Sequence, residues 1–197
     1  MVITGNIIRR EESTIPNHVK NVLTFKHLTP ADKEFILNNF TTEMEDDIFP
    51  LNRIFDFDKI IPEPREESEC PEDCKVNKDS HIMEYKDRPW FDWYTWHTRY
   101  WGTKWNCYDG YVKIGKSTIT FVFSTAWVAP FPIYEQLAND YNFRFEVRYA
   151  DEDIGSNCGY FNYEPNGETG KMRLYQTDAK DCCKDPVKFA ERIWRNY

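Results

Sequence analysis

A chain of 197 residues can bury a hydrophobic core as one domain, and its 17% content of aromatic residues excludes a wholly disordered protein. The formal net charge of −8 argues against a protein that binds nucleic acid through a basic stripe, and it fits either a solvated surface or a basic partner. No stretch approaches the roughly 20 apolar residues of a membrane helix, and the first residues lack the order of a signal peptide, so we expect a cytoplasmic protein.

The first regular elements are expected near the N-terminus. Residues 19–27 are rich in β-branched and other apolar side chains and predict a strand. Thr29 and Pro30 follow as the N-cap and the first position of a helix. The apolar face of that helix would consist of Phe35, Ile36 and Phe40.

Residues 41–78 predict an acidic, loop-rich insertion. Between Asp56 and Asp73 eight acids stand against two bases, and prolines interrupt regular structure. Within this insertion, residues 54–61 pair aromatic with acidic side chains and are expected to dock on the core. A second acidic run, residues 43–47, would belong to the same surface.

Two interpretations of this acidic surface stay open. It is either a solvated loop, or a surface that imitates the charge of nucleic acid and enters a Lys/Arg-lined groove with steered association. If it binds a partner, we expect the contacts to include Glu63, Glu66, Glu67, Glu69, Glu72 and Asp73.

The densest aromatic stretch, residues 90–105, predicts a helix over about residues 89–100 that Gly102 ends. Large aromatic side chains are normally buried, so core packing is the favoured interpretation of residues 101–105. Exposed tryptophans can instead anchor interfaces. We therefore keep four further candidates for partner binding, namely Trp101, Lys104, Trp105 and Trp127.

The second half alternates strands with helices. Alternation and turn residues predict strands at residues 110–114, 117–124, 143–149, 157–163 and 171–175. Helices are predicted at residues 132–141 and from Asp185-Pro186 onward. This order predicts a single α+β domain over residues 1–197, with helices packed on one face of a largely antiparallel sheet.

Three motifs give the chain a family resemblance, and they are Phe55-Asp56-Phe57 before Ile61-Pro62, Trp101-Gly102-Thr103-Lys104-Trp105, and Thr125-Ala126-Trp127-Val128-Ala129-Pro130. Over roughly residues 16–163 the chain resembles the ferredoxin-like family of phage and plasmid accessory proteins first named after an aphid-endosymbiont bacteriophage protein. The resemblance implies a ferredoxin-like α+β core. It also implies a mobile-element protein of the host cytoplasm, a class that includes counter-defence proteins such as anti-CRISPR inhibitors, although fold analogy does not establish function.

The cysteines indicate a metal site only weakly. Cys70 and Cys74 have a spacing tolerated at zinc sites, and His81 and Cys107 would have to complete the set. Reduced thiols are favoured in a cytoplasmic protein, and a disulfide between Cys70 and Cys74 stays open. We expect no metal and no cofactor.

Catalytic residues are weakly indicated too, since no Ser-His-Asp or Cys-His order stands out. The best candidate is His97, beside Asp92 and Arg99. We therefore expect a non-enzymatic protein that binds a host defence or nucleic-acid-handling complex rather than nucleic acid itself. Two alternatives remain, a hydrolase, and a single-stranded nucleic-acid-binding module that uses sheet aromatics beside Arg144 and Arg148.

Overall fold

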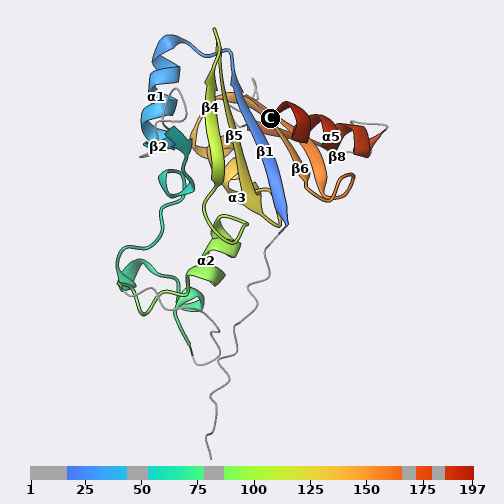
Figure 1. Ribbon diagram of the computed structural model, residues 1–197. Coiled ribbons are helices and arrows are strands. Elements are labelled where there is room, and N and C mark those ends of the chain that lie inside the picture. The colour runs from blue at the N-terminus through green and yellow to red at the C-terminus, as the bar shows by residue number, and fades with distance from the viewer. Residues whose placement is uncertain (1–16, 44–52, 78–86, 166–171, 179–184) are drawn as a thin grey trace, which may run out of the picture.

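The computed structural model describes residues 17–43, 53–77, 87–165, 172–178 and 185–197 (Figure 1). Within these residues a six-stranded antiparallel sheet has the strand order β4-β5-β1-β6-β7-β8. Its strands are β1 (His18–Lys26), β4 (Tyr108–Ile114), β5 (Thr118–Ala126), β6 (Arg144–Asp151), β7 (Cys158–Pro165) and β8 (Met172–Asp178).

The order of elements confirms the predicted ferredoxin-like α+β fold. Strand β1, helix α1 (Pro30–Phe40), strands β4 and β5, helix α3 (Phe131–Asp140) and strand β6 occur in the order β-α-β-β-α-β, and residues 41–107 are inserted between α1 and β4. Strand β1 lies in the middle of the sheet, where it pairs with β5 on one side and β6 on the other. Strands β7 and β8 extend the sheet beyond β6.

Local signals in the sequence account for the helix starts. The Thr29 hydroxyl accepts from the Asp32 amide at 3.2 Å, and the Asp32 carboxylate accepts from the Thr29 amide at 2.8 Å, which is the predicted cap of α1. Asp185 caps α5 (Pro186–Asn196) by accepting from the Lys188 amide at 3.1 Å, ahead of Pro186 at the first helical position.

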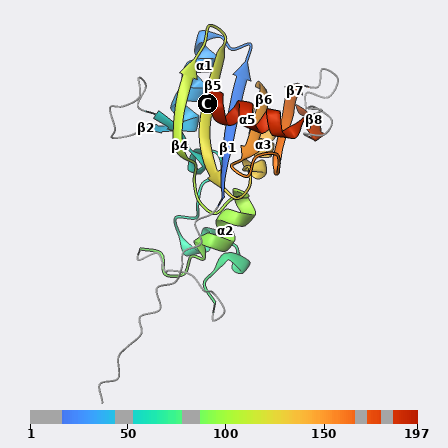
Figure 2. The same cartoon turned by 45° about the vertical axis from the view of Figure 1, so that its right-hand side comes forward.

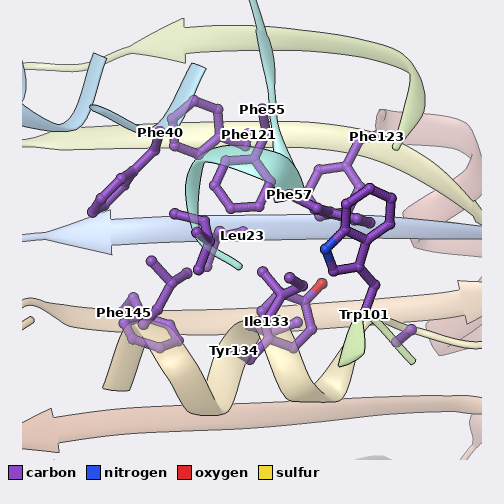
Figure 3. Close-up of a cluster of buried hydrophobic side chains, with 14 of the residues drawn as sticks. Leu23, Phe40, Phe55, Phe57, Trp101, Phe121, Phe123, Ile133, Tyr134 and Phe145 are labelled. Atoms are coloured by element: carbon purple, nitrogen blue, oxygen red, sulfur yellow. The ribbon is translucent and has the colours of Figure 1, made fainter. Parts of the chain in front are cut away.

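The main core lies on the face of the sheet that α3 covers, and Figure 3 shows part of it. The predicted docking of residues 54–61 is confirmed, since Phe55 and Phe57 are fully buried there. The Phe55 ring lies 5.0 Å from Phe121, and the Phe57 ring lies 5.8 Å from Trp101. The acidic insertion is therefore anchored in the core by its aromatic residues.

Helix α5 covers the opposite face of the sheet, where Phe189, Ala190 and Ile193 pack against Val22 and Val122 (Figure 2). The expectation that the helices share one face is wrong for α5. Successive residues of a strand point to opposite faces, so Val22 faces away from the main core that its neighbour Leu23 enters. An apolar strip on the second face thus remains for the amphipathic final helix to cover.

A smaller part of the chain lies beyond the end of the sheet where β1 begins (Figures 1 and 2). It contains α2 (Trp93–Tyr100) and the 3-10 turns η2 (Glu67–Glu69) and η3 (Glu72–Cys74), whereas the 3-10 turn η1 (Phe57–Lys59) contacts α1 and packs against the sheet. Helix α2 begins later than predicted because the Asp92 carboxylate caps it by accepting from the Thr95 amide at 3.0 Å. Gly102 ends this helical segment with φ of +76°, as predicted.

The predicted loop character of residues 41–78 is only partly right. Besides the 3-10 turns, β2 (Thr41–Glu43) pairs with β3 (Arg53–Phe55). The acidic run 43–47 lies outside the described residues except for Glu43, and the connection between the strands predicted at 157–163 and 171–175 lies largely outside them. Across the residues that the structure describes, no helix is long and apolar enough to cross a membrane.

Candidate interaction surface and the buried carboxylate beneath it

Five of the six predicted acidic contact residues form an exposed surface on η2 and η3. We call this surface the acidic ridge, and it consists of Glu66, Glu67, Glu69, Glu72 and Asp73. The Glu69 carboxylate accepts from the backbone amides of Arg65 at 2.8 Å and Glu66 at 3.3 Å, which closes turn η2. The acids thus stand on hydrogen-bonded turns rather than on an irregular loop.

Backbone contacts hold the ridge against the start of α2. The Asp92 amide donates to the Cys74 carbonyl and the Val76 amide donates to the Trp90 carbonyl, each at 2.9 Å. An antiparallel bridge between Lys75 and Phe91 lies between these two bonds. The ridge and the aromatic helix therefore form one connected unit.

Cys70 and Cys74 are buried free thiols under the ridge. The Cys70 thiol donates to the Cys74 carbonyl at 3.3 Å. Burial raises the pKa of Cys70, and burial together with the nearby Cys70 and Asp92 raises that of Cys74 to about 11. Of the proposed zinc set, His81 lies outside the described residues; within them, no group of three or more His, Cys, Asp or Glu side chains could hold a metal ion.

Glu63, the sixth predicted contact residue, does not belong to the exposed ridge. Its side chain is 9% exposed and accepts from Arg88 Nη2 at 2.6 Å and from His97 Nε2 at 2.5 Å. Burial opposes ionisation of Glu63, but these hydrogen bonds outweigh burial and lower the pKa of its carboxyl group. The expectation that Glu63 is a surface residue is therefore wrong, because two basic side chains receive it inside the protein.

His97 is engaged through both ring nitrogens. Nδ1 lies 2.9 Å from the carbonyl of Lys104, and because a carbonyl can only accept, Nδ1 carries a proton. Nε2 faces Glu63, and the ring stacks on Trp101 with centroids 4.1 Å apart. The predicted neighbours of His97 serve other roles, since Asp92 caps α2 and Arg99 pairs with Asp73 of the ridge.

Trp101 is also a core residue rather than a surface contact. Its side chain belongs to the main core, the residue is 2% exposed, and its indole N–H donates to the Ile61 carbonyl at 2.9 Å (Figure 3). A partner could contact Trp101 only if its side chain were exposed, and this packing buries it.

The three remaining candidates meet in what we call the Lys–Trp cluster, formed by Lys104, Trp105 and Trp127. Lys104 Nζ lies 4.6 Å from the Trp105 ring centroid and 5.2 Å from that of Trp127, and all three residues are partly exposed. Trp127 has φ of +67° and is held there by Asn157, which donates to its carbonyl at 2.8 Å. The sequence motifs thus converge on one place at the end of β5.

A cavity of about 350 Å³ lies beside the Lys–Trp cluster. Its wall includes Trp105 of the Lys–Trp cluster, the stacked pair His97 and Trp101, and carboxylates of the acidic insertion, and it is completed by Asp56, Asp58, Glu63 and Asn106. Asp58 pairs with Arg65, and Asp56 accepts from the Asn106 amide at 2.7 Å. The polar groups of this wall are largely engaged with one another.

Arg88 is the residue of this region that sequence analysis missed. It binds Glu63 and also donates to the Pro64 carbonyl at 2.7 Å. Arg88 stands 25 positions after Glu63, and no periodic pattern links them. Only the fold brings them together.

Comparison with known families agrees with the geometry. Residues 100–191 match the family model described as the ferredoxin-like domain in Api92-like protein, whereas searches of curated proteins and of solved structures gave no match. The match includes β4 to β8 and α3, while β1 and α1, which complete the β-α-β-β-α-β order, precede it. Over residues 100–191, the chain is thus similar to the ferredoxin-like domain of Api92-like proteins.

Proposed function

We propose that this protein is a non-enzymatic accessory protein of a phage or mobile element, and that it binds a partner protein through the acidic ridge. The partner would be a host defence or nucleic-acid-handling complex with a Lys/Arg-lined groove, for example a CRISPR effector that the protein inhibits. The observation that carries the proposal is the presentation of five exposed carboxylates on ordered turns.

Order in the ridge supports binding because a fixed backbone loses little conformational freedom on association. A flexible acidic loop would lose that freedom on binding, whereas hydrogen bonds to α2 and the buried thiols Cys70 and Cys74 already fix this backbone. The ridge also remains net negative, because Lys75 and Arg99 offset only part of its five charges. Such a surface would attract and orient a basic groove.

The Lys–Trp cluster would supply an apolar anchor at the edge of the same contact. Interfaces are usually dominated by a few aromatic and basic side chains surrounded by polar contacts. Trp105 lines one cavity with Asp56, Asp58 and Glu63 of the acidic insertion, so a partner that extends from the ridge along this insertion would reach the indole.

The engagement of His97 supports a binding role over a hydrolytic one. A general base needs a nitrogen free to take a proton from substrate or water. Both nitrogens of His97 face protein acceptors, and a reaction at either one would break a buried hydrogen bond.

The test is a triple charge reversal, Glu66→Lys with Glu67→Lys and Glu72→Lys, which spares the turn-closing Glu69 and the paired Asp73. Candidate partners are recovered by pull-down from bacteria that carry defence systems, and purified CRISPR effector complexes are tested directly by biolayer interferometry. We expect the triple variant to associate at least about tenfold more slowly, and added salt to slow the unmodified protein in the same way.

The matched control reverses three exposed acids outside the ridge, Glu34, Glu135 and Glu164, with the same change in net charge. The control should keep the association rate near that of the unmodified protein. If association slows equally in both triple variants, the effect comes from net charge alone and not from the ridge. An unchanged rate in the ridge variant, or recovery of no defence or nucleic-acid-handling protein, would contradict the proposal.

A further inference from the structure

A second cavity, of about 330 Å³, opens on the opposite face of the sheet beside α5. Its polar wall consists of Arg148 of β6, Tyr160 of β7, and Arg192 and Asn196 of α5. Its apolar wall consists of Phe189, Ile193 and Tyr197. A pocket that combines a few convergent polar groups with an apolar wall is typical of a small-ligand site.

The charge in this pocket is positive. Arg192 is exposed, and its guanidinium makes no hydrogen bond or ion pair with the part of the chain that the structure describes. Arg148 is 40% exposed and donates to Glu146 Oε1 at 2.8 Å through Nη2. That bond engages one of the five N–H donors of the guanidinium group.

Glu146, the carboxylate that Arg148 contacts, also binds other partners. It is buried, pairs with Lys26, and accepts from the Tyr160 hydroxyl at 3.1 Å. A further cation lies beside the pocket, since Lys113 Nζ is 4.8 Å from the ring centroid of Tyr197, which lines it. The pocket therefore combines two guanidinium groups with a largely apolar wall, and the acid that Arg148 contacts is also paired with Lys26.

We propose that this pocket binds one nucleotide unit of a single-stranded nucleic acid, with the phosphate on Arg148 and Arg192 and the base against the apolar wall. Guanidinium groups suit phosphate because they present paired donors, and bases stack on aromatic side chains in a sequence-tolerant manner. Lys113 beside Tyr197 extends positive charge past the pocket, which suits a continuing strand better than a free nucleotide.

This site is independent of the acidic ridge. It also differs from the expectation that a chain with a net negative charge does not bind nucleic acid. A net charge of −8 averages over the whole chain, whereas binding depends on the local field. The pocket lies on the sheet face that α5 covers, and the ridge lies beyond the end of the sheet (Figure 2).

The experiment measures fluorescence anisotropy of a labelled oligothymidylate with the full chain at low salt. We expect saturable binding that weakens as salt rises, and a loss of about tenfold in affinity for Arg192→Gln and again for Arg148→Gln. Arg195→Gln is the matched control, since Arg195 is an exposed arginine on the same helix, outside the pocket, paired with Glu191. Circular dichroism verifies that each variant is folded, and Arg192→Lys should restore part of the affinity.

Competition separates the sources of the phosphate. Displacement of the labelled strand by unlabelled oligothymidylate, but not by a nucleoside monophosphate or inorganic phosphate at moderate excess, supports the single strand. Equal displacement by the monophosphate would show that the pocket binds a free nucleotide and would overturn the proposal of a single strand. No binding at low salt, or an equal loss in Arg195→Gln, would overturn the site itself, and either result would leave the acidic ridge unaffected.

Discussion

Glu63 and Glu66 stand three positions apart in one acidic stretch, and the fold treats them in opposite ways. Glu63 is buried between Arg88 and His97, whereas Glu66 belongs to the exposed ridge. Both are glutamates among prolines and other acids. The difference is made by groups that arrive from elsewhere in the sequence.

The comparison teaches that charge density along a sequence does not define a charged surface. A carboxylate leaves water only where partners replace its hydration, since an unpaired buried charge is strongly unfavourable. Arg88 and His97 provide such partners for Glu63, and the ridge acids lack comparable buried cations. One acidic segment thus contains both a buried cluster, in which Glu63 binds Arg88 and His97 and which we call the internal tie, and the exposed ridge.

Removal of the internal tie should have the largest effect. Glu63→Ala leaves Arg88 and His97 without their carboxylate partner, so we expect the free energy of unfolding to fall by about 3–5 kcal/mol. Urea denaturation followed by tryptophan fluorescence measures this. A loss no greater than that of the exposed control Glu66→Ala would show that Glu63 contributes no more than a surface acid.

The buried thiols provide a second measure of how firmly the ridge is held. A pKa of about 11 leaves Cys74 with roughly a hundredfold less thiolate at about pH 8 than an ordinary cysteine, and burial limits access further. Alkylation by iodoacetamide, mapped by mass spectrometry, should therefore be slow at Cys74. Rapid modification in the folded protein would mean that the ridge opens readily. The ridge would then not be an ordered surface that can be contrasted with buried Glu63.

Acid should weaken the internal tie selectively. Because the pKa of Glu63 is lowered in the folded state, its contribution to stability is complete above the unfolded-state pKa and is lost as the pH falls through the folded-state pKa. The difference in unfolding free energy between the unmodified protein and Glu63→Gln should therefore shrink as the solution is acidified. A difference that stays constant down to strongly acidic pH would contradict this assignment.

The ridge should show the smallest effect on folding. Glu66→Gln with Glu67→Gln should change the free energy of unfolding by less than about 0.5 kcal/mol, because surface substitutions and exposed ion pairs contribute little. Thermal denaturation measures this change. A larger loss would assign the ridge a structural role and weaken its proposed role in binding.

Much of the fold followed from local signals that the sequence carries openly. The cap at Thr29 and the alternation through residues 143–149 predicted their elements because each depends on neighbours in sequence. The side of the sheet that α5 covers was missed, since amphipathicity shows that a helix has an apolar face but not which sheet face receives it.

The candidate sites were less predictable because they depend on contacts between segments that are distant in the sequence. The exposed ridge followed from composition, whereas the burial of Glu63 and Trp101 depends on Arg88, Ile61 and His97, which the fold brings in from other segments. The positive pocket beside α5 joins residues from two strands and the last helix. Arg148 was noted in the sequence as a residue beside sheet aromatics, but nothing there indicated that Arg192 would lie with it.

The central place of β1 has a consequence for how the chain acquires its structure during synthesis. The side chain of Asn21 in β1 donates to Thr125, 104 positions later, and the partners of β1 in β6 are made later still. At a synthesis rate of about 5–20 residues per second, β1 therefore exists for several seconds before either neighbouring strand has been made. Contacts this distant along the chain slow folding, so β1 can pair only after β5 has been made, and residues 100–191 made alone would lack their middle strand.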